Sequence, residues 1–267
     1  MFRLMFATVL LPACLLQAAE WSPPPKPIEF TIGGSFNFGP ADGFLQTPAG
    51  GEPGTSSGRR PTLHELNIDD AAFYDTYLKL QWHALGFFGG YQFIRFDESG
   101  AFSRPLVSRD IAFAAGDPFN THVRFDWYHV GAGWKFAWLG DRLEVFPKVE
   151  GAVLDFSYKL AGPSESASRS YAKGCVRLGV ASTYHLSHRL SLNLDGAASI
   201  PISNTPQIAT VTATVNFRPL RENRVLNPTV FVGGGAEWID YEDNQKLSNH
   251  IRLELGPFVT AGLSLSF

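Results

Sequence analysis

The chain has very little cysteine and, beyond its first residues, no long hydrophobic run. Its two cysteines are Cys14 and Cys175, in a sequence of 267 residues. If an N-terminal signal is removed, Cys175 remains alone, and a single cysteine cannot form a disulfide within the chain. No run of 18 apolar residues follows residue 19, so a transmembrane helix is excluded on length. Insertion into a membrane would therefore require a β-barrel.

Clusters of positive charge are also scarce. The formal net charge is -3, and the dipeptide Arg59-Arg60 is the one basic cluster that stands out. This composition argues against nucleic acid as a partner, which would require a basic surface. The length is typical of a single domain.

The first residues have the features of a secretory signal peptide. Arg3 precedes the apolar run 4–16, and small residues at 18 and 19 predict a signal peptide over 1–19. An alternative interpretation takes 11–14 as a lipoprotein cleavage box, which would leave its cysteine lipidated, although its proline fits such a box poorly. The proline-rich residues 20–27 predict a stiff periplasmic leader before a barrel over 28–267.

The rest of the chain repeats a single pattern. Stretches of about ten residues or more alternate in polarity and are bounded by Gly, Pro, Asn and Asp, which predicts β-strands. We expect ten strands. Eight or twelve are the alternatives, if two of these segments form one strand or one segment forms two. The segments are 28–38, 71–83, 86–96, 121–138, 142–158, 170–185, 189–200, 208–218, 229–241 and 249–267. Connections alternate between short and long, so one end should carry turns and the other loops.

The last segment alternates in polarity from His250 and ends on an aromatic residue, Phe267. It resembles the C-terminal strand of bacterial outer-membrane β-barrel proteins, which is read by the barrel-assembly machinery. The resemblance implies an all-β, antiparallel up-and-down transmembrane barrel in the outer membrane of a Gram-negative bacterium. It also implies Phe267 as an assembly signal, and contact with outer-membrane lipid and lipopolysaccharide. It names no activity.

Periodicity does not decide which parity faces lipid. In a soluble periplasmic barrel resembling a lipocalin the apolar parity would face inward, whereas in a membrane barrel it faces outward. The strand lengths, the unequal loops and the aromatic residues near strand ends favour the membrane. We therefore expect polar side chains inside the barrel.

This facing predicts charged residues in the lumen, referred to below as the predicted charge network. Its members are Lys79, Arg124, Lys135, Glu144, Lys148, Glu150, Lys173, Arg177, Asp195, Glu237, Arg252 and Glu254. Thr210, Thr212, Thr214 and Asn216 should form a polar ladder beside it. A ten-stranded barrel encloses little more than its own side chains, so the lumen should be filled. A structural or binding role at the surface follows, or a narrow passage for small polar solutes.

Two segments change parity midway. In 121–138 the apolar residues move from one parity to the other near 128–131, and 142–158 shows the same slip near 151–154. A β-bulge at each place would restore the facing.

The longest predicted loop, 39–70, holds one local signal. Thr62 and Glu65 form a capping-box pattern, which predicts a helical turn from about Leu63 to Leu66. Arg59-Arg60 has the guanidinium groups suited to lipopolysaccharide phosphates.

No cofactor or metal is expected. The glycine-rich 54–58 lacks the lysine and the preceding strand of a phosphate-binding loop. The histidines form no pair at a recognised metal-ligand spacing except His185 and His188, which lie at a predicted turn.

The alternative from another class is a hydrolase or acyltransferase that acts on membrane lipid at the barrel rim. Such chemistry needs a nucleophile, a base and a group that orients the base. The candidates at predicted loop ends are His64, Glu65, Asp69, Asp70, Ser103, Ser108, Asp110, His122 and His250. Their spacing matches no enzyme motif, so we assign no catalytic residue.

Overall fold

The computed structural model describes residues 28–48, 58–220 and 226–267, which are built almost entirely from β-strands. The strands are β1 (Ile28–Gln46), β2 (Asp70–Trp82), β3 (Leu85–Phe93), β4 (Arg95–Ala101), β5 (Leu106–Ser108), β6 (Ile111–Phe113), β7 (Pro118–Trp134), β8 (Phe136–Trp138), β9 (Leu143–Ala161), β10 (Ser166–His185), β11 (Leu190–Ser199), β12 (Gln207–Phe217), β13 (Asn227–Glu242) and β14 (His250–Ser266). The 3-10 turn η1 spans His64–Leu66, and no helix in these ranges could span a membrane. The expected signal peptide and leader lie outside the described residues.

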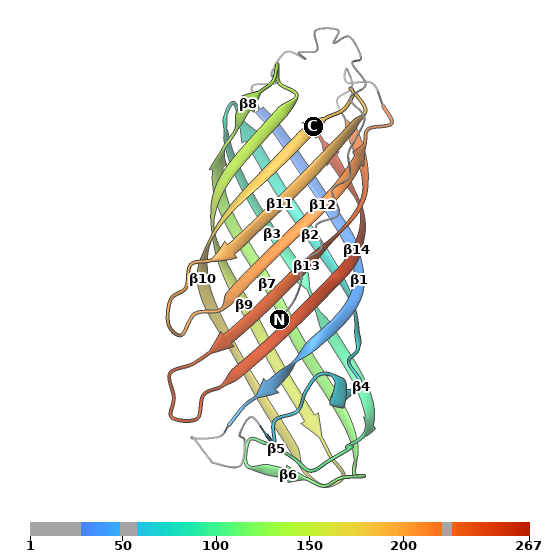
Figure 1. The fold of residues 1–267 in the computed structure, drawn as a ribbon, viewed down its shortest axis with the longest axis vertical. Coiled ribbons are helices and arrows are strands. Elements are labelled where there is room, and N and C mark those ends of the chain that lie inside the picture. Colours follow the sequence, from blue (N-terminus) through green and yellow to red (C-terminus); the bar gives the residue numbers. More distant parts are fainter. Residues whose placement is uncertain (1–27, 49–57, 221–225) are drawn as a thin grey trace, which may run out of the picture.

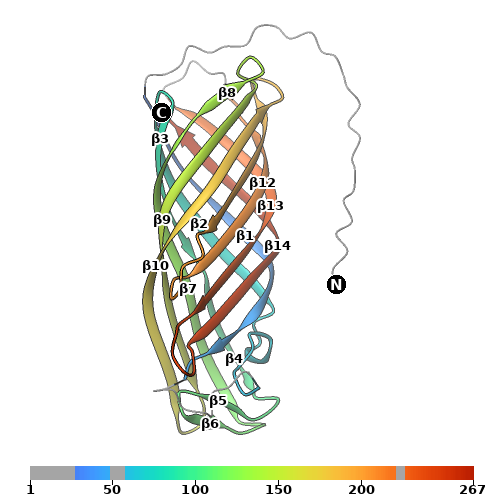
Figure 2. The ribbon, with the colours of Figure 1, turned by 60° about the vertical axis from the view of Figure 1, so that its left-hand side comes forward.

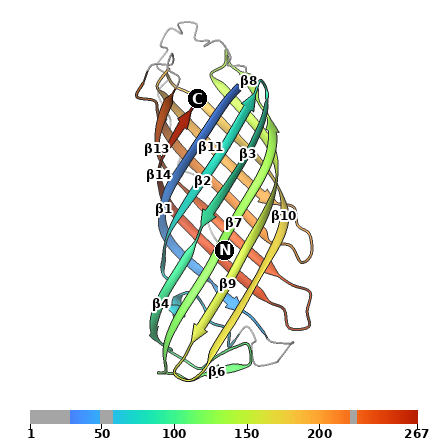
Figure 3. The same ribbon diagram turned by 180° about the vertical axis from the view of Figure 1, so that it is seen from behind.

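The strands close into an up-and-down antiparallel barrel, seen from three sides in Figures 1, 2 and 3. β3 and β4 both pair with β7, β7 and β8 both pair with β9, the other barrel strands pair with their neighbours in the chain, and β1 pairs with β14 to close the sheet. β3 and β4 follow a single register along β7, and β7 and β8 do so along β9. Each of these pairs is therefore one interrupted strand, which confirms the predicted ten-stranded barrel.

The two ends of the barrel differ. Short connections join β2 to β3, β8 to β9 and β10 to β11 at one end, called here the turn end, where β8 and the C-terminus lie (Figure 1). At the other, the loop end, 47–69 and 102–117 are the longest connections, and the latter contains the β5–β6 hairpin. Strands run further into the loop end than predicted. β1, for example, continues to Gln46 rather than ending at residue 38.

In the turn-end half, apolar side chains point outward. Ile28, Phe30, Ile32, Phe36 and Phe38 are exposed along β1, in alternation with interior residues. The same pattern on the other strands forms an apolar band about nine to eleven residues long per strand. At the usual strand tilt, that length spans the hydrocarbon layer of about 25 Å. This half has the facing of a transmembrane barrel and not of a soluble one.

In the loop-end half the facing is reversed, so that apolar side chains point into the barrel and polar side chains point outward. Phe73, Phe125, Phe156 and Ile239 are fully buried inside it, within one apolar core. Polar residues such as His122 and Lys159 lie on the outside of the same strands. Long strands such as β7, β9 and β10 therefore continue from a membrane barrel into a half with a water-facing exterior.

The bulges predicted in 121–138 and 142–158 are wrong. β7 pairs with β9 in one register from Asn120↔Ala161 to Gly133↔Lys148, with no shift. Val123 and Val130 have opposite parity because Val123 faces the loop-end core and Val130 faces outward in the apolar band. The change of parity in the sequence marks the boundary between the two halves.

β14 does contain a bulge, at a position where the sequence alternates smoothly. Around Gly256 and Pro257, β14 contains one residue more than the paired stretch of β1 on one side and of β13 on the other. Gly256 has φ +118°, which a side chain disfavours. Leu253 therefore faces the core, whereas Val259 faces outward. The expectation that one apolar parity faces lipid along the whole segment is wrong.

Candidate functional site

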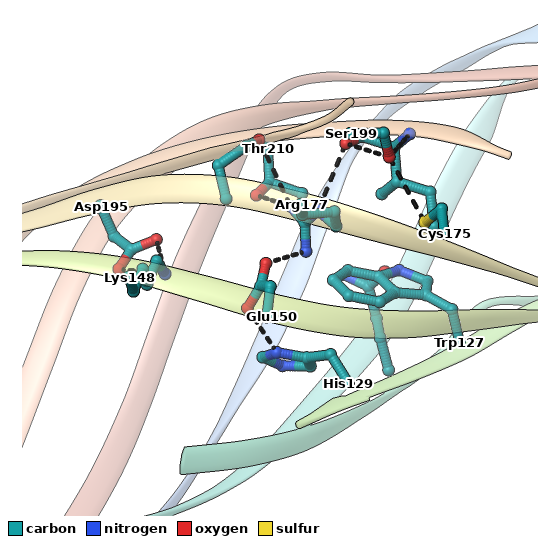
Figure 4. Close-up of polar contacts among 12 residues, drawn as sticks. Trp127, His129, Lys148, Glu150, Cys175, Arg177, Asp195, Ser199 and Thr210 are labelled. Atoms are coloured by element: carbon teal, nitrogen blue, oxygen red, sulfur yellow. Dashed lines mark hydrogen bonds and ion pairs between the residues drawn. The ribbon is translucent and has the colours of Figure 1, made fainter. Parts of the chain in front are cut away.

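The centre of the barrel holds a buried ion pair, drawn in Figure 4. The Arg177 Nη1 atom lies 2.7 Å from Glu150 Oε1, and both side chains are at most 2% exposed. His129 Nδ1 lies 2.8 Å from the other Glu150 oxygen. Arg177 also donates to Thr210 Oγ1 at 2.6 Å. Its guanidinium carbon lies 4.7 Å from the centre of the Trp127 ring.

A second buried group adjoins this pair through Trp127. The Trp127 indole donates to Glu237 Oε1 at 3.1 Å and also to Gln92 Oε1. The Gln92 amide donates to the other Glu237 oxygen at 2.9 Å. These contacts link β3, β7 and β13 across the interior, so a hydrogen-bonded polar layer fills the middle of the barrel.

Other members of the predicted charge network lie inside the turn-end half. Lys148 Nζ is 2.8 Å from both Asp195 oxygens, and Lys135 Nζ is 3.4 Å from Glu144 Oε1. Lys79 lies over the Phe146 ring at 4.8 Å. Lys173 is further along, nearer the loop end, where it lies over the Tyr241 ring at 5.8 Å. The ladder of Thr210, Thr212, Thr214 and Asn216 also faces inward on β12.

Three predicted members lie on the outer face instead: Arg124, Arg252 and Glu254. The Arg124 Nη2 atom donates to Asp155 at 2.9 Å outside the barrel, and Arg252 forms an ion pair with Glu254. All three lie in the loop-end half, where apolar neighbours such as Phe125 and Leu253 occupy the core. Asp126, on the parity of Arg124, also bonds on that face, to Arg95.

The loop end is closed by a cap of apolar side chains. Leu63, Leu66 and Ile68, on and beside η1, are at most 1% exposed. Phe102, Leu106 and Phe113, from 102–117, are buried in the same core. The predicted turn is present at His64–Leu66. Its capping box is formed by Thr62, whose backbone N–H donates to Glu65, and by the Glu65 N–H, which donates to Thr62 Oγ1.

Arg104 holds this cap in place and was not singled out from the sequence. Its guanidinium donates to Glu65 Oε1 at 2.5 Å and Oε2 at 3.0 Å, and also to the Gly58 and Arg60 carbonyls. Burial by itself raises the pKa of Glu65, but the bonds from Arg104 and Thr62 outweigh it and leave the pKa below its ordinary value.

The histidines of the loop end each contact a carboxylate. His64 pairs with Asp69 at 2.5 Å, and His122 with Asp97 at 2.5 Å. His250 Nε2 lies 3.0 Å from Asp240. Ser108, another candidate, is buried and bonds to Thr47 at 3.1 Å. In the described ranges no hydroxyl or thiol bonds to these three imidazoles, and no group of three metal-binding side chains occurs.

Arg60 is used in packing. Its guanidinium carbon lies 3.2 Å from the centre of the Phe44 ring, and its Nη1 donates to Gln46 at 3.4 Å. Burial lowers the pKa of Arg60.

Comparison with known proteins identifies no family. No protein-family model matches the chain, and no curated protein does. Ail, the attachment invasion locus protein of Yersinia pestis, aligns at 9% identity over 88% of this chain and 98% of its own, with a TM-score of 0.35. The outer membrane protease OmpT of Escherichia coli aligns at 10% identity over 89% and 97%, with a TM-score of 0.47. A mutant of the monoaromatic hydrocarbon channel TodX aligns at 8% identity over 91% and 90%, with a TM-score of 0.34. At these values the likeness carries no argument about activity.

Proposed function

We propose that this protein is a sealed barrel of the outer membrane of a Gram-negative bacterium, with its loop end outside the cell and a binding or structural role at that surface. The observation that carries the proposal is the closed interior. A polar layer around Glu150 and Arg177 fills the middle of the barrel, and the apolar core and its cap fill the loop-end half.

The membrane location is supported by the apolar band. Trp82, Trp134 and Trp138 are exposed near its turn-end edge, and Tyr74 and Tyr128 near its loop-end edge. Aromatic residues favour these positions at the two interfaces of a bilayer. The turns would face the periplasm, as in other barrels of this architecture.

Passage of polar solutes is disfavoured by the apolar core. A hydrated ion that left the polar layer would meet Leu154, Phe156 and Leu253, which are buried and provide no hydrogen bonds from their side chains. Transfer of an unpaired charge into such surroundings is very costly, on the order of tens of kcal/mol in the limiting case.

Planar-bilayer conductance tests the proposal. We expect no unitary current from the refolded protein, and none from the variant with Lys148→Ala and Glu150→Ala, because the apolar core lies beyond both residues. A channel-forming porin in the same bilayers serves as the positive control, and heat-modifiable migration shows that both proteins are folded. A steady current from the unmodified protein would refute the sealed interior.

A lipid hydrolase is the second candidate, and the pairing of His122 with Asp97 is the observation that favours it. A carboxylate can orient an imidazole as a base, but acyl transfer also needs a nucleophile. Mass spectrometry of lipid A from cells with and without the protein tests this role. A product that disappears with His122→Ala would support the enzyme over the binding protein.

A further inference from the structure

The barrel wall is uneven at the loop end. β11 and β12 have 10 and 11 residues, whereas β10, β13 and β14 have 20, 16 and 17. Figures 1 and 2 show the β11–β12 connection ending well before the others. Toward the loop end from this connection, the barrel wall has a step. The taller β13–β14 hairpin stands beside that step.

An apolar groove lies below this step, on the outer face of β10 to β13. It is shallow and open to the outside, has a volume of about 870 Å³, and reaches β14 at Glu254 to Gly256. Large side chains such as Leu178, Leu194 and Val211 border it, and small residues such as Gly196 and Ala209 also line it. Leu178 is 55% exposed, and the groove belongs to the apolar band. Its surface suits a hydrocarbon chain that lies across the strands.

A polar hollow of about 590 Å³ lies directly above, between the connections 200–206 and 243–249. Asp240, Glu242 and Asp243 line it together with Asn204, Gln207 and Gln245. The Asn244 N–H donates to Asn204 Oδ1 at 2.7 Å, which joins the two connections. Carboxylates and amides accept hydrogen bonds, so this lining suits a neutral group rich in hydroxyls. A phosphate would be repelled by the three carboxylates.

Trp238 lines both hollows. It lies at the loop-end edge of the apolar band, where an aromatic ring contacts both hydrocarbon and headgroups. The Arg252 guanidinium lies 5.7 Å from its ring centre on the other side, which holds the ring in place. The groove and the hollow therefore form one continuous surface. Its apolar part can contact the hydrocarbon chain of an amphiphile, and its polar part can contact the headgroup.

We propose that this surface binds one glycolipid of the outer leaflet, with an acyl chain in the groove and sugar hydroxyls in the hollow around Asp240. The inference rests on the proposed membrane location and adds a ligand class to it. Because three carboxylates line the hollow, the headgroup that it accepts is an uncharged saccharide.

Native mass spectrometry of the detergent-purified protein with a synthetic, uncharged diglucosyl diacylglycerol tests this inference. We expect one bound equivalent and weaker retention of phosphatidylglycerol. Gly196→Leu should reduce retention because its side chain fills the groove. A Cβ at this position lies 3.7 Å from the nearest atom, so the change fits the fold. Asp240→Asn should weaken binding by about three- to tenfold, as expected for one altered hydrogen bond.

Gly151→Leu is the matched control. Gly151 faces outward on β9, away from the groove, and a Cβ there meets nothing within 4 Å. It should bind the diglucosyl lipid like the unmodified protein. Equal retention of both lipids, or equal loss in both glycine variants, would overturn the inference.

The membrane proposal is tested separately by co-flotation of all variants with phosphatidylcholine vesicles. A protein that floats with the vesicles but shows no lipid preference would contradict only the glycolipid site. A protein that fails to insert at all would contradict the proposed function itself.

Discussion

At the scale of single residues, Glu150 and Arg177 form an ion pair inside the barrel, with both side chains at most 2% exposed. Removal of one partner of a buried pair leaves the other charge without compensation. We expect Glu150→Gln to lower the free energy of unfolding by about 3 kcal/mol. Urea unfolding of the protein in lipid vesicles, followed by tryptophan fluorescence, measures this loss.

The double variant Glu150→Leu with Arg177→Met is the informative control. Apolar side chains of similar size can replace a buried pair with little loss, so its stability should recover most of the difference. Asp195→Asn should cost less than Glu150→Gln, since Asp195 is 30% exposed. A double variant less stable than the single one would mean that the pair itself stabilises the barrel.

Glu65 makes the cap sensitive to acid. Because its pKa is lowered in the folded protein, its contribution to stability is present above the pKa of the open loop. That contribution is lost as the pH falls through the folded value. Hydrogen exchange of the Leu66 and Ile68 amides, corrected for intrinsic rates, should speed up at acidic pH while the strands stay protected. Glu65→Gln should exchange faster at neutral pH and lose this dependence.

Local signals in the sequence predicted part of these sites. Thr62 and Glu65 are three residues apart, so their reciprocal bonds follow from helix geometry. Arg104 is 39 residues from Glu65, and no local pattern brings the two together. The prediction that Arg124 and Arg252 face the lumen is wrong because it assumes polar side chains inside along the whole strand. In the loop-end half, apolar side chains face inward and polar side chains face outward.

At the scale of elements, the bulge in β14 reconciles two environments within one strand. Without the extra residue, either Leu253 would leave the core or Val259 would leave the apolar band. We expect Gly256→Ala to destabilise the barrel by about 1–3 kcal/mol, because φ +118° is strained for any residue with a Cβ. The midpoint of heat-modifiable migration on gels measures the change.

Gly174→Ala provides the comparison, since Gly174 lies on the outer face of β10 with 3.7 Å of space around a Cβ. It should migrate like the unmodified protein. Equal shifts in both variants would remove the special role of the bulge.

The number of strands was predictable because turn residues and alternation are local. The bulge was not, because Ile251 to Phe267 alternates evenly in sequence and only pairing with β1 and β13 shows the extra residue. β1 was predicted too short for a related reason. Beyond Phe38 its outer face becomes polar, and its inner face continues as Ala41 and Leu45.

At the scale of the whole molecule, the two halves predict different access to water. With Cys175→Ser as background, a cysteine at Ser168, on the outer loop-end face of β10, should react rapidly with a water-soluble maleimide in intact vesicles. A cysteine at Leu178, in the apolar band of the same strand, should react only after detergent is added. Equal labelling of both positions in vesicles would contradict the proposed membrane boundary.

The length of the water-facing half determines how far the barrel extends beyond the apolar band. Some eight residues of β10 extend past the apolar band, which at the usual rise and tilt corresponds to roughly 20 Å. In the proposed orientation, with the loop end outward, the cap formed by η1 and the β5–β6 hairpin would stand above the lipid headgroups. Large particles that approach the cell would meet this tip first, whereas the shorter β11–β12 side remains within reach of small molecules near the bilayer. In that orientation, the uneven height of the barrel would separate its contacts by size and distance before any side chain recognised them.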